Sequence, residues 1–260
     1  MKPLIVVTCF NRIRETMKCL LALLRTTLHK SCYGIISNNG IDSAESICIN
    51  NICEPVFCLT EEHFPEIKSK IFYPKTNIGT SRSLNLSINE QREPNQPLVK
   101  IDNDMVLKSK TWIQDLLELE QTYPDVGMIS GYYGDATHRW TSSVEFGEFK
   151  GKKLWKAKTI TGHCVWHTGS LMDKVKYFDV LSPEHLYGFE DTLMSIKANV
   201  LGMKMLIWEG FEVEALKTEP ALGVKGNEMQ AQKMQKLFEE RANDIKFNRK
   251  VECNSEGELI

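Results

Sequence analysis

The sequence lacks long hydrophobic runs and an excess of charge of one sign. No stretch approaches the roughly 20 apolar residues of a membrane-spanning helix, and the first apolar run, Leu4–Val7, is too short for the core of a signal peptide. We therefore expect a cytoplasmic protein without a membrane span. The net charge of −2 gives no overall positive field that would attract nucleic acid, although a local basic patch is compatible with that value.

The sequence also lacks closely spaced cysteine pairs and glycine-rich phosphate loops. None of its eight cysteines forms a CxxC pair, and Cys9, Cys19 and Cys164 lie among apolar residues, where a thiol packs as a small hydrophobic group. Because no secretory signal is evident, we expect reduced thiols rather than disulfides or a zinc site. Neither GxGxxG nor a Walker loop occurs, so a phosphate ligand would need another kind of partner.

Short apolar runs alternate with helical patterns in the first hundred residues. Strands are predicted at 4–9, 33–37, 54–59 and 98–101, and helices at 15–28 and 80–89. Strands separated by helices favour right-handed βαβ crossovers and a largely parallel sheet with helices on both faces. We therefore predict an α/β fold with a mixed, mostly parallel sheet, in which ligands bind beyond the carboxyl ends of the strands.

The second half of the chain is less regular. Helices are predicted at 112–123, 170–178 and 191–201, strands at 126–130, 204–208 and within 153–167, and a polar excursion at 131–150. The chain becomes polar from residue 226, where a weak amphipathic helix precedes a polar end. We expect a catalytic domain at 1–225, divided into halves at 1–107 and 108–225, followed by a helical tail at 226–260 with a flexible end.

Two carboxylates follow the strand predicted at 98–101. Asp102 and Asp104 are two residues apart at the carboxyl end of this strand, so both can face one small volume. They would repel each other there unless a cation lay between them. A hard divalent cation binds one or two carboxylates and completes its shell with substrate phosphates and water. The simpler interpretation of Asp102-Asn103-Asp104 is a turn, since Asp and Asn favour turns.

A second acidic pair, Glu190 and Asp191, precedes the helix predicted at 191–201. Acidic residues in a first turn are stabilised by the helix dipole, so an ordinary helix start explains them. A general base also explains them, since a carboxylate can remove the proton of an acceptor hydroxyl. Both interpretations stay open on these residues alone.

Five segments occur in the order, and with the spacing, of a known family. They are VVTCFNR at 6–12, SNNG at 37–40, NIGTSRSLN at 77–85, DND at 102–104 and GFED at 188–191. In turn, they resemble the opening strand and turn, the VDNGS-type turn, the NxGxxxxxN segment, the DXD motif and the acceptor-side ED motif of family 2 glycosyltransferases. The resemblance extends over residues 4–209.

This resemblance implies a fold and a reaction. The fold would be of the GT-A type, with a half that binds the nucleotide sugar followed by a half that binds the acceptor. The reaction would be the transfer of a sugar from a nucleoside-diphosphate sugar, with a UDP-sugar as the first choice, to an acceptor hydroxyl. It would proceed with inversion and with the help of a divalent metal, Mn²⁺ or Mg²⁺.

The resemblance also implies roles for individual residues. Those that would bind the nucleotide sugar are Thr8, Asn11, Arg12, Asn38, Asn77, Gly79, Arg82, Asp102 and Asn103. Asp104, with Asp102, would bind the metal, Asp191 would be the catalytic base and Glu190 would shape the acceptor side. Two positions depart from the family: Asn38 stands where Asp is usual, and Val213–Glu219 contains no His of the kind that completes many of its metal sites. The nucleobase and the third metal ligand therefore stay open.

Two histidines, His163 and His167, are four residues apart, which places both on one face of a strand or of a helix. A metal-binding pair is one interpretation of this spacing. The apolar residues between them favour instead a structural role or a place in the acceptor pocket.

The acceptor and the alternatives to this reaction stay open. A glycan, a protein, a small molecule or, as in some phage-type enzymes, a modified DNA base could accept the sugar, and the oligomeric state is not indicated. A nucleotidylyltransferase can share a similar nucleotide-binding half, but it usually has a glycine-rich basic loop where this chain has Phe10–Arg14. A non-catalytic binder of nucleotides or carbohydrates would not need both acidic motifs.

Overall fold

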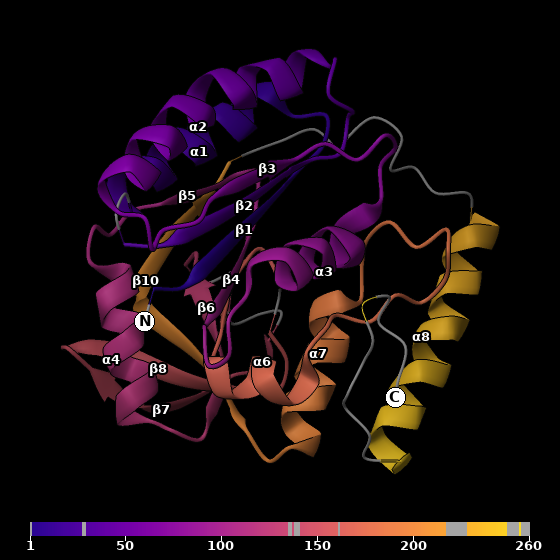
Figure 1. The fold of residues 1–260 in the computed structure, drawn as a ribbon. Coiled ribbons are helices and arrows are strands. Elements are labelled where there is room, and N and C mark those ends of the chain that lie inside the picture. The colour runs from indigo at the N-terminus through magenta and orange to yellow at the C-terminus, as the bar shows by residue number, and fades with distance from the viewer. Residues whose placement is uncertain are drawn as a thin grey trace.

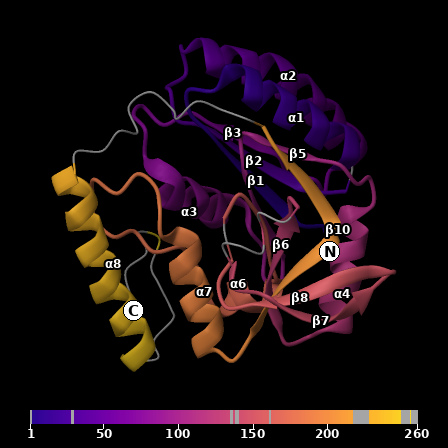
Figure 2. The ribbon, with the colours of Figure 1, turned by 180° about the vertical axis from the view of Figure 1, so that it is seen from behind.

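The computed structural model describes residues 2–27, 30–134, 137, 141–160, 162–216, 228–248 and 255. One mixed sheet runs through the protein, with the strand order β3-β2-β1-β4-β9-β6-β10-β8-β7 and with β5 paired to β10. Helices lie on both faces of this sheet, as the two opposite views in Figures 1 and 2 show. The predicted α/β fold is thereby confirmed.

The first hundred residues supply a parallel block of strands. It consists of β1 (Leu4–Cys9), β2 (Cys32–Ser37), β3 (Lys70–Phe72) and β4 (Leu98–Asp102). The ladders β3-β2, β2-β1 and β1-β4 are all parallel. The carboxyl ends of β1, β2 and β4 therefore meet at one edge, where Thr8 lies in register between Ile36 and Asp102.

Three helices connect these strands: α1 (Ile13–Thr27), α2 (Ala44–His63) and α3 (Gly79–Gln91). The strand predicted at 54–59 is wrong, because these residues belong to α2. Ile49, Cys53 and Phe57 are spaced four apart and bury one face of this helix, with exposures of 0, 0 and 5%. This helical spacing extends through 54–59 and outweighs the strand-like composition of that short segment.

The second half brings antiparallel pairing into the sheet. Its strands are β5 (Met105–Leu107), β6 (Val126–Tyr132), β7 (Val144–Phe149), β8 (Lys152–Ala157), β9 (Cys164–His167) and β10 (Lys204–Ala215). The region predicted as a polar excursion thus includes β7. Because β9 runs antiparallel to β4, the start of β9 lies beside the end of β4, and Asp102 N donates to His163 O at 2.8 Å.

The helices that the structure describes in the second half are α4 (Trp112–Thr122), α6 (Gly169–Val175), α7 (Glu190–Val200) and α8 (Glu228–Asn248). Two hydrophobic cores lie on opposite faces of the sheet: one packs against α1, α2 and α4, the other against α3, α6, α7 and α8. Among the described residues, no helix is both long and apolar enough to cross a membrane.

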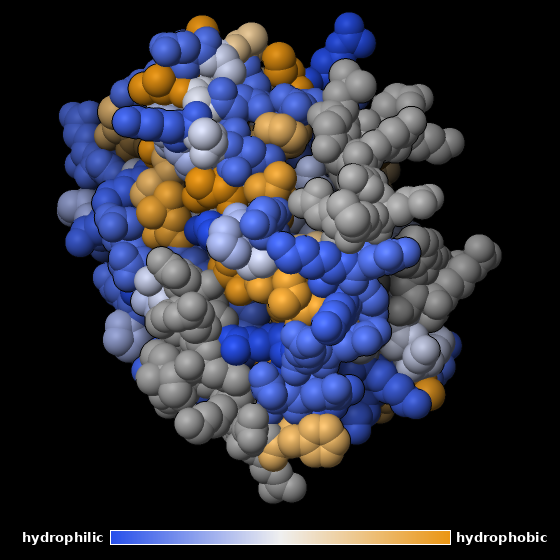
Figure 3. Space-filling model, turned by 90° about the vertical axis from the view of Figure 1, so that its right-hand side faces the viewer, coloured by the Kyte–Doolittle hydropathy of each residue, from blue (hydrophilic) through white to orange (hydrophobic). Residues whose placement is uncertain are grey.

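The helix α8 packs against the rest of the protein rather than standing apart from it. The rings of Phe238 and Phe189 stack at 4.4 Å, and Ala242 and Ile245 are buried. Figure 3 views the side on which α8 lies: most of this surface is hydrophilic, and hydrophobic residues gather near its centre. The predicted boundary after residue 225 lies outside the described residues. So does the predicted flexible end of the tail, since Ser255 is the one residue described after residue 248.

Candidate functional site

A pocket of about 300 Å³ lies at the edge where the parallel strands end. The residues that line it are Thr8, Phe10, Arg12, Asn38, Asn77, Gly79, Thr80, Asp102, Asn103, Asp104, His163, Tyr187 and Glu190. Of the residues predicted to form the site, only Asn11, Arg82 and Asp191 are not part of this lining. Residues from both halves of the chain therefore line one pocket. Most of its polar lining residues are among those predicted from the sequence.

One buried carboxylate, Glu45, organises the loop that follows β1. Its oxygens accept hydrogen bonds from Asn11 N at 2.9 Å, Arg12 N at 3.4 Å and Thr16 Oγ1 at 2.8 Å. Asn103 Nδ2 in turn donates to Thr16 Oγ1 at 2.7 Å. Asn11, which has a left-handed φ of 53°, thus lies beside the pocket with its amide bound to Glu45. This role of Glu45 could not be predicted from the sequence, since a Glu in a first helical turn is common.

Asn38 connects the end of β2 to the start of α3. Its Nδ2 donates to Ser83 Oγ at 3.0 Å, and its Oδ1 accepts from Ile78 N at 3.3 Å. The side chain is 4% exposed. Both ends of the amide therefore have partners in the protein, and an aspartate at this position would lack the donor that Asn38 offers to Ser83.

Gly79 is required by close contact as well as by conformation. Its φ is +78°, and a Cβ there would lie 2.5 Å from Leu186 O. Thr80 N donates to this same carbonyl at 2.6 Å. The start of α3 therefore touches the loop that precedes α7, and no larger residue fits between them.

Arg82 binds this loop too, rather than facing the pocket. Its guanidinium donates to Ser182 O at 2.9 Å and to His185 O at 3.2 Å. The loop continues to Tyr187, which lines the pocket and is 38% exposed. Arg82 thus contributes to the pocket wall indirectly, through the loop that carries this aromatic ring.

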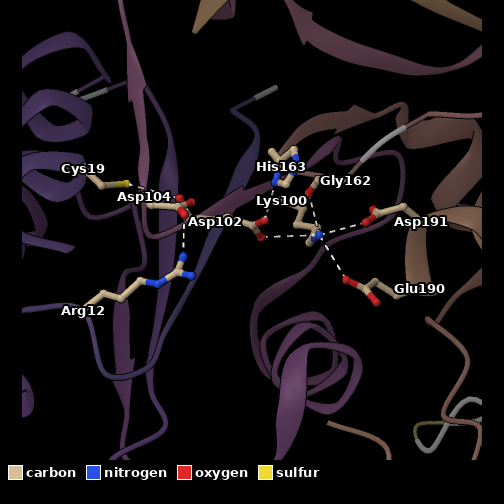
Figure 4. Close-up of polar contacts among 9 residues, drawn as sticks. All are labelled: Arg12, Cys19, Lys100, Asp102, Asp104, Gly162, His163, Glu190 and Asp191. Carbon is tan, nitrogen blue, oxygen red and sulfur yellow. Dashed lines mark hydrogen bonds and ion pairs between the residues drawn. The ribbon is translucent and has the colours of Figure 1, made fainter. Parts of the chain in front are cut away.

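Three basic side chains lie beside the carboxylates of the DND segment (Figure 4). Arg12 Nη1 is 2.5 Å from Asp104 Oδ2. Asp102 contacts His163 Nδ1 at 3.2 Å through Oδ2 and Lys100 Nζ at 3.4 Å through Oδ1. The two acidic side chains are therefore close to one another but balanced by different partners.

These neighbours shift the protonation of the two aspartates in opposite directions. Burial and the charge of Asp102 raise the pKa of Asp104, although Arg12 opposes this. Burial also works to raise the pKa of Asp102, but Lys100 and His163 outweigh it and lower that pKa. The hydrogen bond to Asp102 raises the pKa of His163. Of the two aspartates, Asp102 therefore stays ionised to the lower pH.

The chemistry of this pair fits a divalent ion. Carboxylate oxygens are the ligands that Mg²⁺ and Mn²⁺ prefer, and the repulsion that raises the pKa of Asp104 is relieved by a cation. Across the described ranges, however, no group of three His, Cys, Asp or Glu side chains is arranged to bind a metal. Asp104 and Asp102 would therefore bind the ion together with ligands from elsewhere, such as phosphate oxygens and water.

The second acidic pair lies on the other side of Lys100 (Figure 4). Lys100 Nζ is 2.9 Å from Asp191 Oδ2 and 3.3 Å from Glu190 Oε1. Glu190 lines the pocket, and Asp191 lies next to it against Gly162. Asp191 Oδ1 and Glu190 Oε2 accept no hydrogen bond within the part of the chain that the structure describes.

Asp191 has the protonation behaviour expected of a general base. Burial raises the pKa of Asp191 to about 6; Lys100 acts against this shift, and the adjacent Glu190 adds to it. A catalytic acid or base works best when its pKa lies near the working pH. This carboxylate can therefore take up a proton under ordinary conditions.

The sequence did not single out Lys100, and it left the role of the histidines open. Lys100 lies within a short apolar run, which predicts a strand and no role in the site for this side chain. His167 is fully buried with its ring 5.3 Å from that of Phe178, and burial lowers its pKa to about 3. Of the two interpretations that the sequence favours, a structural role or a place in the acceptor pocket, burial supports the structural one for His167, while His163 lines the pocket.

Comparison with known structures shows the fold. The mannosyltransferase PcManGT from Pyrobaculum calidifontis, solved with GDP-Man and Mn²⁺, aligns over 95% of this chain and 70% of its own length, with 10% identity and a TM-score of 0.56. S. aureus TarS 1–349 with UDP-GlcNAc aligns over 93% and 66%, with 12% identity and a TM-score of 0.59. GalNAc-T7 with UDP, GalNAc and Mn²⁺ aligns over 95% and 50%, with 10% identity and a TM-score of 0.62.

The chain therefore has the fold of GT-A glycosyltransferases, and it spans between 50% and 70% of the length of these neighbours. No protein-family model and no curated protein matches its sequence. These structures share the fold of this chain at 10–12% identity, so its function depends on the residues in its own pocket.

Proposed function

We propose that the protein is a glycosyltransferase that moves a sugar from a nucleoside-diphosphate sugar to an acceptor hydroxyl, with inversion and with the help of a divalent metal. The observation that carries this proposal is the arrangement of acidic pairs: Asp102 and Asp104 on one side of Lys100, Glu190 and Asp191 on the other. This arrangement offers separate groups for the leaving diphosphate and for the acceptor at one edge of a GT-A sheet.

The donor would lie along the edge formed by β1, β2 and α3. Thr8, Arg12, Asn38, Asn77, Gly79 and Asn103 would line its nucleotide, with Asn11 and Arg82 supporting the loops on either side. Asp104 and Asp102 would hold a Mn²⁺ or Mg²⁺ ion. When bound, this ion supplies positive charge that stabilises a departing diphosphate. Arg12, which contacts Asp104, lies where it could add a second positive charge.

An inverting transfer is an in-line displacement. The acceptor oxygen forms a bond to the anomeric carbon as the bond from that carbon to the diphosphate oxygen breaks, so the acceptor proton must leave on the side opposite to the diphosphate. Asp191 would take that proton, and Glu190, which lines the pocket, would orient the acceptor. The pKa of about 6 suits Asp191 to this task.

The choice of donor is a proposal from the neighbours. Two of the structures named above hold uridine nucleotides and one holds a guanosine nucleotide, so a UDP-sugar is the first donor to test. The acceptor in this proposal belongs to one of four classes: a glycan, a protein, a small molecule or a modified DNA base.

The test is a donor panel. The protein is incubated with UDP-, GDP- and TDP-sugars in Mn²⁺, with and without EDTA, and release of the nucleoside diphosphate is followed. We expect slow hydrolysis of one donor that EDTA abolishes. Release of pyrophosphate from nucleoside triphosphate and sugar phosphate would instead indicate a nucleotidylyltransferase, and binding without any turnover would indicate a non-catalytic protein.

A further inference from the structure

Lys100 lies at the centre of the polar cluster, although it stands in the middle of a buried strand. It is 2% exposed, and it precedes Asp102 by two residues, so both side chains lie on the same face of β4. Figure 4 shows its ammonium between Asp102 on one side and the Glu190–Asp191 pair on the other.

The ammonium of Lys100 contacts three separate parts of the chain. Its Nζ is 3.4 Å from Asp102 Oδ1, 2.9 Å from Asp191 Oδ2 and 3.3 Å from Glu190 Oε1. It also donates to Gly162 O at 2.5 Å. Lys100 thus joins the end of β4, the start of α7 and the turn before β9 at one point.

The start of α7 carries its acidic pair without a capping side chain. Its N-cap residue, Phe189, has a left-handed φ of 67° and makes no side-chain capping hydrogen bond. Glu190 and Asp191 are adjacent buried carboxylates, which repel each other and disfavour burial unless a positive charge is near. Among the described residues, Lys100 is the cation that contacts both.

Asp191 is confined from a second direction. A Cβ at residue 162 would lie 1.3 Å from Asp191 Oδ2, so only glycine leaves room for this carboxylate. The position of Asp191 is therefore set jointly by the ammonium of Lys100 and by the bare backbone of Gly162.

We propose that Lys100 is a positioning residue: it holds Glu190 in the pocket wall and Asp191 next to it, at a set distance from Asp102, and so aligns the acceptor side of the reaction with the donor side. This inference rests on the proposed function. Lys100 acts through the carboxylates that it contacts and takes no proton itself. Small displacements of a reacting group lower turnover strongly, about a hundredfold for 1 Å.

The test compares two buried lysines. Lys100→Met removes the ammonium and keeps the length of the side chain, and we expect kcat to fall about a hundredfold with KM for the donor within about threefold of the wild type. Lys197→Met is the matched control: Lys197 is 0% exposed and pairs with Asp179 at 2.5 Å, away from the pocket. Its removal should lower the unfolding temperature while leaving kcat near the wild-type value.

A second variant reaches Asp191 without changing Lys100. Gly162→Ala should displace the carboxylate and give the same loss of kcat at an unchanged KM for the donor. It also serves if Lys100→Met does not fold. Asp191→Asn should cost little further kcat in the Lys100→Met background, because both changes would remove the same aligned carboxylate.

The outcomes separate this inference from the proposed function. Normal kcat in both Lys100→Met and Gly162→Ala, or an equal fall of kcat in Lys197→Met, would overturn the role of Lys100 while leaving the glycosyltransferase standing. If the wild type consumes no donor, the proposed function fails. Thermal unfolding then still tests the contact, since additive effects of Lys100→Met and Asp191→Asn on the unfolding temperature would show that Lys100 does not hold Asp191.

Discussion

The two sides of the pocket are held together in different ways. On the side formed by residues 2–107, parallel ladders align the strand ends, and side chains such as Glu45 and Asn38 bind backbone amides of the neighbouring loops. On the side formed by later residues, His163, Tyr187 and Glu190 come from loops and from a helix start. Ion pairs with Lys100 and hydrogen bonds from Arg82 link this side to the first one.

We expect the side formed by residues 2–107 to be rigid and the side formed by later residues to be adjustable. Backbone hydrogen bonds within a parallel sheet leave little freedom in the position of Thr8 or Asp102. Ion pairs between side chains tolerate more displacement, and loops carry most of the variation in specificity among related proteins. We therefore expect changes on the first side to affect metal and donor binding, and changes on the second side to affect turnover.

The largest effect is expected at the proposed metal ligand. Asp104→Ala removes a carboxylate from a metal site, and metal ions contribute several kcal/mol to charge stabilisation, so turnover should fall by about 10³-fold or more. Turnover is measured in Mn²⁺ and in EDTA. The control is Asp115→Ala, which should remain active. It removes a carboxylate of α4 that pairs with Lys150. Full activity of the wild type in EDTA would contradict the metal assignment.

Next in size is the effect at the proposed base. Asp191→Asn keeps the size of the side chain but removes its basic oxygen, so kcat should fall by about 10²–10⁴-fold while donor binding changes little. Glu190→Gln should act mainly on KM for the acceptor. If Asp191→Asn turned over normally and Glu190→Gln were inactive, the two roles would be exchanged.

The wild-type pH profile gives an independent check on Asp191. The base must be ionised to act, and the pKa of Asp191 is raised to about 6. Turnover should therefore decrease as the pH falls below about 6, by tenfold for each further pH unit. A profile that stays flat down to pH 4.5 would speak against Asp191 as the base.

A smaller effect is expected at the contact between the two sides. Gly79→Ala puts a Cβ 2.5 Å from Leu186 O at a φ of +78°. The free energy of unfolding should fall for two reasons, the left-handed conformation of the alanine and its steric overlap with Leu186 O. Gly134→Ala has the same φ with nothing within 4 Å and shows the conformational cost alone, about 1–2 kcal/mol. Gly79→Ala should cost about 1–3 kcal/mol more, measured by denaturant unfolding. Equal losses would contradict the close contact.

The smallest effect is expected at Glu45. Glu45→Gln removes the charge that binds the amides of Asn11 and Arg12, and hydrogen bonds to charged groups contribute about 1.5–3 kcal/mol. Donor affinity should fall while kcat changes less. The control is Glu61→Gln in the same helix, whose carboxylate accepts from Ser69 N away from the pocket. Titration with UDP compares the two variants, and equal affinities would contradict the role of Glu45.

The sequence predicted the rigid side of the pocket better than the adjustable one. Asp102 and Asp104 could be placed because they follow an apolar strand directly, and the ends of parallel strands meet at one edge. The sequence analysis does not predict the helix α2, since the short run at 54–59 has a strand-like composition and its helical face is visible only together with Ile49 and Cys53.

The contacts of Lys100 and His163 could not be predicted from local patterns. The contacts of His163 with Asp102 and of Lys100 with Gly162 depend on the antiparallel pairing of β9 with β4. These two strands are about 60 residues apart in the sequence, and no turn or motif between them indicates that they pair. Lys100 also breaks the expectation that a buried strand position is apolar, because its partners come from a helix 90 residues later in the chain. Such long-range pairs become visible only in the folded protein.

A crystal of the protein soaked with UDP and Mn²⁺ would show whether the pocket binds a nucleotide and a metal. We expect diphosphate density beside Asp102 and Asp104, an ion bound to Asp104, and the uridine along Thr8, Asn38 and Asn77. Glu190 and Asp191 should remain on the opposite side of Lys100, facing the space left for the acceptor. Nucleotide bound away from this pocket, or no binding of any nucleoside diphosphate at millimolar concentration, would rule out the proposed donor site.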